Sequence, residues 1–171
     1  MIAVCFHGVE STAKSVLARK LSAELGCPWV PEFGREYCEA HGTDLTMADL
    51  LAIAEGQARA VDAAAAQGPA LLLLDTDQLM TAAWAQMLFG EVPPVLMGYP
   101  KADHYLHFAP DVPWIDDGTR FFGTAGERAR FDAIARAVLA DAGIVAVEVA
   151  GDWSSRESAV RQALAEFRAK A

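Results

Sequence analysis

The chain has 171 residues, of which 53% are hydrophobic and 22% charged, and this balance predicts one folded domain over residues 1–171. Its formal net charge of −9 argues against binding to nucleic acid or to an anionic membrane, because both attract basic patches. The three cysteines form no CxxC pair, so neither a disulfide framework nor a zinc site is expected. The first residues show no charged leader and no cleavable apolar stretch, and we expect a cytoplasmic protein.

Short apolar runs alternate with longer segments of helical period along the chain. The expected strands are residues 2–6, 29–30, 70–74, 105–108 and 145–149. Continuous apolar runs such as Leu71–Leu74 are typical of strands buried on both faces of a parallel sheet. The alternation predicts an α/β fold of three layers, in which helices cover both faces of a sheet of about five parallel strands.

Three of the expected helices have recognisable start signals. Each begins with Ser or Thr followed three residues later by an acidic residue, which is the pattern of a capping box. The pairs are Thr46 with Asp49, Thr124 with Glu127, and Ser154 with Glu157. The last two helices also carry an apolar face, which consists of Phe131, Ile134, Val138 and Leu139 in one and Val160, Ala163, Leu164 and Phe167 in the other.

A phosphate-binding loop follows the first expected strand. Residues 8–15 read GVESTAKS, the P-loop pattern GxxxxGK[ST] with alanine in place of the second glycine. In such a loop the backbone N–H groups and the lysine hold phosphates, and the hydroxyl binds Mg²⁺. The residues expected to bind ATP here are Gly8, Glu10, Ser11, Thr12, Ala13, Lys14, Ser15 and Val16, with Lys14 also catalytic and Ser15 also a Mg²⁺ ligand.

Ala13 stands where the P-loop pattern has glycine, whose backbone there often takes φ values that a Cβ disfavours. Two outcomes are open. Either the loop adopts a negative φ and tolerates the methyl group, or the methyl group crowds the phosphate and weakens ATP binding. The neighbouring functional residues are all present, so we expect a negative φ and tolerance.

Carboxylates follow the second and third expected strands. Asp75 comes directly after Leu74, and we expect it in the ligand crevice as a catalytic, Mg²⁺-linked carboxylate, because ligands of open α/β sheets bind at the carboxyl ends of the strands. Glu32 follows residues 29–30 and falls at the same edge. A carboxylate there can orient and deprotonate the hydroxyl that attacks the phosphoryl group.

Two further charged residues near these strand ends have more than one interpretation. Asp77 either holds substrate or serves as a plain carboxylate at the start of the next helix. Arg35 either binds phosphate or holds Glu32 in place, and the alternative is a solvated ion pair on a surface loop.

A lid is expected over roughly residues 114–130, after the fourth strand. P-loop kinases commonly use a segment here to bring arginine over the transferred phosphoryl group and to exclude water. Arg120 is the first candidate for this catalytic, ATP-binding arginine and Arg128 the second. For Arg128 the alternative is a solvated arginine in a helix-capping loop.

Four segments together resemble the ribosylnicotinamide kinase domain of bacterial NAD-salvage proteins, a P-loop kinase family. They are GVESTAKS at 8–15, WVPEFGREY at 29–37, LLLLDTD at 71–77 and WIDDGTRFFG at 114–123, in the family's order and spacing. The resemblance implies a P-loop kinase-like fold with a helical lid, and an ATP-dependent kinase that makes nicotinamide mononucleotide from nicotinamide riboside. It also implies Lys14 and Ser15 on ATP and Mg²⁺, Asp75 and Asp77 near metal and ribose, and Arg120 in the lid.

A pyridinium riboside is a flat cation, so its pocket should offer aromatic faces and carboxylates. The residues expected to bind this substrate are Glu32, Phe33, Arg35, Tyr37, Asp77, Trp84 and Asp117. Two other functions stay open: a kinase for another nucleoside or small hydroxyl compound, and an ATP-binding regulatory module that has lost turnover. The intact Lys14, Glu32 and Asp75 favour an enzyme. The sequence does not settle whether the chain forms a homo-oligomer.

Overall fold

The computed structural model describes residues 1–115 and 121–170. Within them the chain forms a parallel sheet of five strands in the order β2-β3-β1-β4-β5. The strands are β1 (Ile2–His7), β2 (Trp29–Val30), β3 (Leu71–Asp75), β4 (His104–Phe108) and β5 (Val147–Val149). The predicted order of strands along the chain is therefore confirmed, with bounds that shift by one or two residues.

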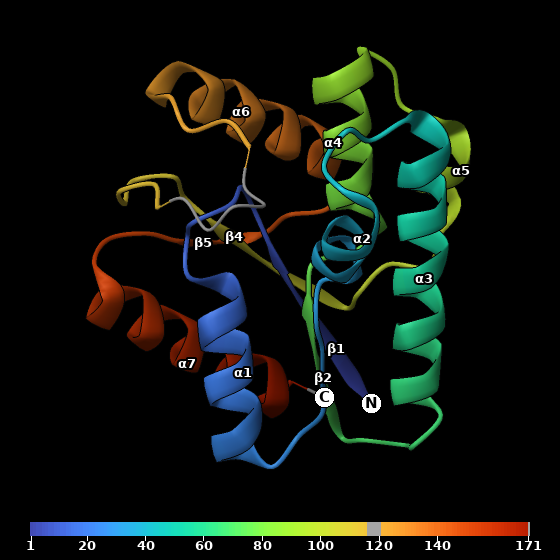
Figure 1. Ribbon diagram of the computed structural model, residues 1–171. Coiled ribbons are helices and arrows are strands. Elements are labelled where there is room, and N and C mark those ends of the chain that lie inside the picture. The colour runs from blue at the N-terminus through green and yellow to red at the C-terminus, as the bar shows by residue number, and fades with distance from the viewer. Residues whose placement is uncertain (116–120, 171) are drawn as a thin grey trace.

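Helices cover both faces of the sheet (Figure 1). They are α1 (Lys14–Leu25), α2 (Phe33–His41), α3 (Met47–Ala65), α4 (Gln78–Phe89), α5 (Pro94–Gly98), α6 (Ala125–Asp141) and α7 (Trp153–Ala169). One core joins α1 and α7 to the sheet, and a second core joins α3, α4, α5 and α6 to the opposite face. No helix in the described part of the chain is both long and apolar enough to cross a membrane.

The central strands supply side chains to both cores in alternation. In β3, Leu71 and Leu73 belong to the core under α1 and α7, whereas Leu72 and Leu74 belong to the core on the other face. All four are at most 5% exposed. This two-sided burial explains why the run is apolar throughout instead of alternating with polar residues. The predicted three-layer α/β fold follows from it.

The capping boxes at Thr46 and Thr124 are confirmed, with both reciprocal hydrogen bonds present. The box expected at Ser154 is wrong. Helix α7 begins two residues earlier, and the Asp152 side chain accepts the backbone N–H of Ser155 at 2.8 Å. Gly151 precedes this cap with φ +89°, a turn that glycine adopts readily, and the turn makes Asp152 the N-terminal cap.

Arg156 of α7 ties three loops together at the carboxyl edge of the sheet. Its side chain is 1% exposed, and it donates to the carbonyl oxygens of Thr12 at 3.2 Å, Ala109 at 3.0 Å and Gly151 at 2.7 Å. It also pairs with the carboxylate of Asp111. A buried guanidinium with several acceptors fixes its neighbours strongly, so Arg156 holds the loop after β1 against the loops after β4 and β5.

Gly56 gives a test of how tightly α2 packs on α3. A Cβ at this buried position would lie 2.5 Å from Cζ of Phe33 and closer to two other ring atoms. We expect Gly56→Ala to lower the free energy of unfolding by about 1–3 kcal/mol through overpacking, although alanine is the better helix former. Gly126→Ala is the matched control. Gly126 is exposed in α6 with nothing within 4 Å of its would-be Cβ, and alanine there should stabilise by about 0.5–1 kcal/mol. Urea unfolding measures both, and equal effects would contradict the tight α2–α3 contact.

Candidate active site

The side chain of Lys14, the first residue of α1, folds back onto the loop between β1 and α1. Lys14 is 8% exposed, and its Nζ donates to the carbonyl oxygen of Val9 at 2.7 Å. The Thr12 hydroxyl donates to the same carbonyl at 2.8 Å. Buried ammonium groups need acceptors, and the lysine shares this carbonyl with the Thr12 hydroxyl within the loop. Its charge therefore lies at the N-terminus of α1, where helix N–H groups favour anions.

Ala13 does not adopt the negative φ that we expected. Its φ is +76° and its ψ +8°, in the left-handed region, and Ser11 also has a positive φ of 57°. The first hydrogen bond of α1 runs from Leu17 N to Ala13 O at 3.0 Å, so Ala13 is the N-terminal cap of the helix in this conformation. The cost of a Cβ there is about 1–2 kcal/mol. The loop accepts that cost and keeps the shape that glycine provides in the pattern.

Asp75 ends β3 and has the features of a cation ligand. It is 1% exposed, and its Oδ1 has no hydrogen-bond partner among the described residues. Burial raises the pKa of its carboxyl, while Lys14 and a hydrogen bond from the Ser15 hydroxyl oppose that rise. An unsatisfied carboxylate oxygen beside a hydroxyl is a donor set that suits a hard cation such as Mg²⁺.

No group of three or more His, Cys, Asp or Glu in the described part of the chain could hold a metal ion. A cation at Asp75 and Ser15 would therefore need phosphate oxygens and water as its remaining ligands. Mg²⁺ sites in phosphoryl-transfer enzymes are usually of that kind.

Asp77 caps α4 from inside the protein. It is 4% exposed, its Oδ1 accepts the N–H of Leu79 at 3.0 Å, and the hydroxyl of Tyr105 donates to its Oδ2. Burial raises the pKa of its carboxyl. The helix-capping interpretation of Asp77 is thus observed, although the residue also lines a cavity.

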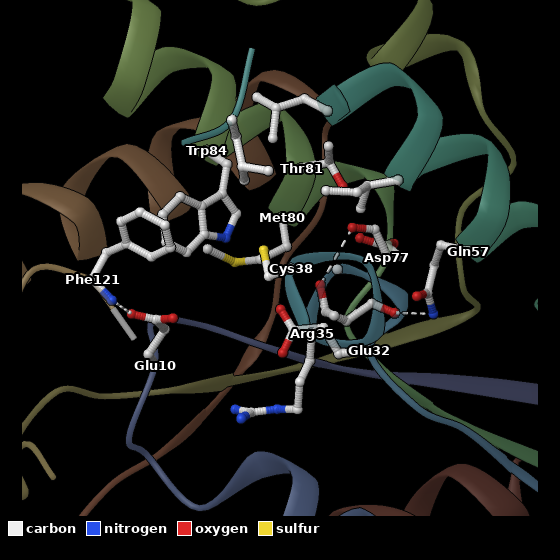
Figure 2. A pocket seen from close by; sticks show the side chains of 15 residues that line it. Glu10, Glu32, Arg35, Cys38, Gln57, Asp77, Met80, Thr81, Trp84 and Phe121 are labelled. Atoms are coloured by element: carbon white, nitrogen blue, oxygen red, sulfur yellow. Dashed lines mark hydrogen bonds between the residues drawn. The ribbon is translucent and has the colours of Figure 1, made fainter. Parts of the chain in front are cut away.

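Two neighbouring cavities open at the carboxyl edge of the sheet. The first lies among α2, α3 and α4 (Figure 2). The second follows the loop between β1 and α1. The residues that line both cavities are Glu10, Glu32, Arg35, Met80 and Trp84. The shared residues form a common wall, where a phosphate in one cavity would meet a small molecule in the other.

The structure brings most of the predicted site residues together. The second cavity is lined by all eight loop residues expected to bind ATP, namely Gly8, Glu10, Ser11, Thr12, Ala13, Lys14, Ser15 and Val16. The first is lined by four expected substrate residues, Glu32, Arg35, Asp77 and Trp84. Asp117 and Arg120 lie outside the described residues.

Phe33 and Tyr37 are not among the residues that line either cavity. The N–H of Phe33 donates to the side chain of Gln57 at 2.8 Å, and the Phe33 ring packs against α3. The hydroxyl of Tyr37 donates to Asp49 at 2.6 Å, and its ring stacks on His41. The Phe33 ring therefore packs between α2 and α3, and Tyr37 reaches α3 through its hydroxyl.

Arg128 is buried rather than solvated. It is 6% exposed and donates to the carbonyl oxygens of Glu10 and Val112, both at 3.2 Å. It lies outside the lining of the two larger cavities, although it lines a third, small one. These contacts join the loop after β1 to the segment after β4.

Several residues of the first cavity were missed in the sequence. Cys38, Gln57, Met80, Thr81 and Phe121 all line it. On α4 a signal was available, because Asp77, Met80, Thr81 and Trp84 are spaced by three or four residues and share a helix face. No comparable pattern marks Phe121, which reaches the cavity through a backbone hydrogen bond to Glu10 at 2.8 Å.

This chain is similar to known proteins both in sequence and in structure. The AAA domain family matches residues 3–156. The trifunctional NAD biosynthesis/regulator protein NadR of Escherichia coli (strain K12) is 30% identical over 161 residues, which cover 90% of this chain and 39% of the relative. The chain thus spans about two fifths of the length of this curated relative.

Solved structures agree with the sequence matches. The crystal structure of NadR protein in complex with NR has a TM-score of 0.84 and 26% identity, and the match covers 98% of this chain and 52% of that one. A deoxyadenosine kinase from M. mycoides has a TM-score of 0.69 at 11% identity, with 96% and 100% covered, and shows the fold alone. The predicted P-loop kinase-like fold and the resemblance to the kinase domain of NAD-salvage proteins are both confirmed.

The left-handed Ala13 leads to a prediction for Ala13→Gly. Glycine removes the cost of a Cβ at positive φ but adds flexibility to the unfolded chain, so the free energy of unfolding should rise by no more than about 1 kcal/mol. Because the loop already has the glycine conformation, ATP affinity should change by less than about tenfold. Urea unfolding and calorimetric ATP titration at one Mg²⁺ concentration measure the two effects. A gain of about a hundredfold in affinity would show that the methyl group crowds the phosphates.

Proposed function

Because this chain belongs to the AAA domain family, whose match covers residues 3–156, we propose that it is an ATP-dependent kinase that phosphorylates nicotinamide riboside to nicotinamide mononucleotide. One observation carries the proposal. A cavity lined by the P-loop and an adjoining cavity share a wall that includes Glu32. The choice of acceptor is supported by the similarity to NadR, whose structure was solved in complex with NR, which is nicotinamide riboside.

The second cavity suits the triphosphate of ATP. It combines the N-terminus of α1, successive backbone N–H groups of the loop, and the ammonium group of Lys14. When phosphate binds, Lys14 exchanges the carbonyl of Val9 for phosphate oxygens, which are stronger acceptors for a cation. The left-handed Ala13 preserves the shape of this loop, which favours an active kinase over a regulatory module without turnover.

Asp75 and Ser15 would hold Mg²⁺ on the phosphates. A bound Mg²⁺ ion would neutralise charge that develops on the phosphate oxygens during transfer. In its absence, Asp75 is a buried carboxylate with an unsatisfied oxygen, balanced by Lys14 and by the hydroxyl of Ser15. A carboxylate buried without a partner costs free energy, and such groups are common at sites that bind a ligand.

Glu32 is the proposed base for the acceptor hydroxyl. It lies on the wall shared by the two cavities, directly after β2. In the proposed reaction the hydroxyl oxygen of the riboside bonds to the γ-phosphorus while the bond to the β–γ bridging oxygen breaks. The hydroxyl proton passes to the Glu32 carboxylate and ADP leaves. Arg35 shares the same wall and would stabilise charge on the transferred phosphoryl group.

Aromatic rings line the acceptor cavity at the end away from Asp77 (Figure 2). The rings of Trp84 and Phe121 meet edge to face, with centroids 5.2 Å apart. Such rings provide flat apolar surface for the base of a riboside and attract a cation over their faces. The hydroxyl end of the substrate would then lie toward Glu32.

The reaction itself can be tested directly. We expect the protein, incubated with Mg-ATP and a panel of ribosides, to add one phosphoryl group to nicotinamide riboside in preference to uridine, cytidine and adenosine. Mass spectrometry of the products measures this. A protein that phosphorylates the other nucleosides as well would be a general nucleoside kinase, and one that phosphorylates no compound in the panel would contradict the proposal.

A second prediction concerns Glu32. Replacement by glutamine keeps the shape of the side chain and removes the base, so kcat should fall by roughly 10²–10⁴ while ATP affinity barely changes. Glu39→Gln, on the exposed side of α2, removes the same charge outside both cavities and should leave kcat unchanged. Steady-state kinetics and ATP titration give both quantities. If Glu32→Gln loses ATP binding instead, the residue belongs to the metal site or to the fold.

A further inference from the structure

Glu10 connects the phosphate loop to the acceptor cavity. It is the third residue of the P-loop motif, yet its Oε2 accepts the backbone N–H of Phe121 at 2.8 Å, across 111 residues of sequence. Figure 2 shows this carboxylate beneath Phe121, at the same end of the cavity as Trp84. Glu10 lines both cavities. Its negative charge therefore lies next to the aromatic rings that line the acceptor cavity.

Neighbouring aromatic side chains fix the orientation of the Trp84 ring. Trp84 contacts Phe131 and Phe122, with ring centroids 4.6 Å and 5.4 Å apart, in addition to its edge contact with Phe121. A tryptophan with neighbours on several sides keeps one orientation, because rotation would disrupt the surrounding packing. A flat ring that enters the cavity thus meets fixed aromatic surfaces with the Glu10 carboxylate beside them.

Carboxylates outnumber cationic side chains among the described residues of the acceptor cavity. Its described lining residues include three carboxylates, Glu10, Glu32 and Asp77, and one cationic side chain, Arg35. Arg35 also lines the second cavity, together with the P-loop residues. Among the three carboxylates, Asp77 accepts hydrogen bonds from the N–H of Leu79 and the hydroxyl of Tyr105, whereas Glu10 and Glu32 both line the shared wall.

A thiol in the cavity lies close to the same carboxylates. Cys38 lines the cavity, and its pKa is raised first by burial and then by the carboxylates of Glu32 and Glu10. Arg35 lowers this pKa, but by less than either carboxylate raises it. A second anion in this cavity would meet the same repulsion, since charges interact strongly where water is scarce.

We infer that Glu10 sets the charge specificity of the acceptor site, so that the site takes a cationic riboside and rejects the analogue whose ring carries a carboxylate in place of the carboxamide. This inference rests on the proposed function, because it concerns the acceptor of that reaction. The pyridinium ring of nicotinamide riboside is attracted by the Glu10 carboxylate and by the aromatic faces. Nicotinic acid riboside has the same ring but brings a carboxylate to the same place, where like charges repel.

The test compares binding of these two ribosides, measured by calorimetry with a non-hydrolysable ATP analogue present. We expect wild-type protein to bind nicotinamide riboside at least about tenfold more tightly, which corresponds to about 1.4 kcal/mol. Glu10→Gln keeps an oxygen that accepts the N–H of Phe121 but removes the charge, and should reduce this ratio by about tenfold. Glu10→Asp keeps the charge and should keep the preference. Glu39→Gln is the control for loss of a charge elsewhere and should leave the ratio unchanged.

Each outcome decides one question. Equal affinity of the wild type for both ribosides, or an unchanged ratio in folded Glu10→Gln, overturns the inference. Turnover is measured separately with Mg-ATP. Selective binding without phosphorylation would support the role of Glu10 and contradict the kinase function, whereas phosphorylation of both ribosides at equal kcat/KM would support the kinase and overturn the inference. If neither riboside binds, both are wrong.

Discussion

The parallel pairing of β1 with β3 sets Phe6 opposite Asp75, and the site depends on this register. Both strands are buried on two faces, so each side chain has a fixed side of the sheet. A slip by one residue would move the Asp75 side chain to the other face, away from Ser15 and Lys14. Adjacent β2 pairs with β3 in the same direction and delivers Glu32 to the same edge. Three segments far apart in sequence thus meet because three strands end together.

The chain is strained where these strands end. Ser11, Ala13 and Thr76 all have positive φ although none is glycine, and Thr76 is β-branched with φ +74°. A β-branched residue rarely adopts this conformation, which costs on the order of 1–3 kcal/mol. Thr76 lies between Asp75 and Asp77, and its N–H is held by the carbonyl of Phe6 at 3.1 Å. The strained turn points one carboxylate toward the phosphate loop and the next into the cap of α4.

Some residues of the site could be predicted because they follow a strand or stand at a fixed position in the P-loop pattern. Lys14, Ser15, Glu32 and Asp75 could be predicted because the order of strands fixes which residues reach the carboxyl edge. The conformation of Ala13 could not, because residue preference favours a negative φ for alanine, whereas Ala13 and its neighbour Ser11 both have a positive φ in this loop.

The wall of the acceptor cavity was harder to predict. Phe121 reaches it through a hydrogen bond to Glu10, 111 residues away, and Gln57 and Cys38 reach it through the packing of α3 and α2. Such contacts depend on the angles between helices, for which the sequence has no local signal.

The shared wall has a pharmacological consequence. Under the proposed function, a single compound that joins a riboside to adenosine through a short chain of phosphates would place its riboside in the first cavity and its phosphates in the second. Its second half would bind at the effective concentration set by the linker, typically millimolar for a short flexible one, so its avidity would exceed the affinity of either half.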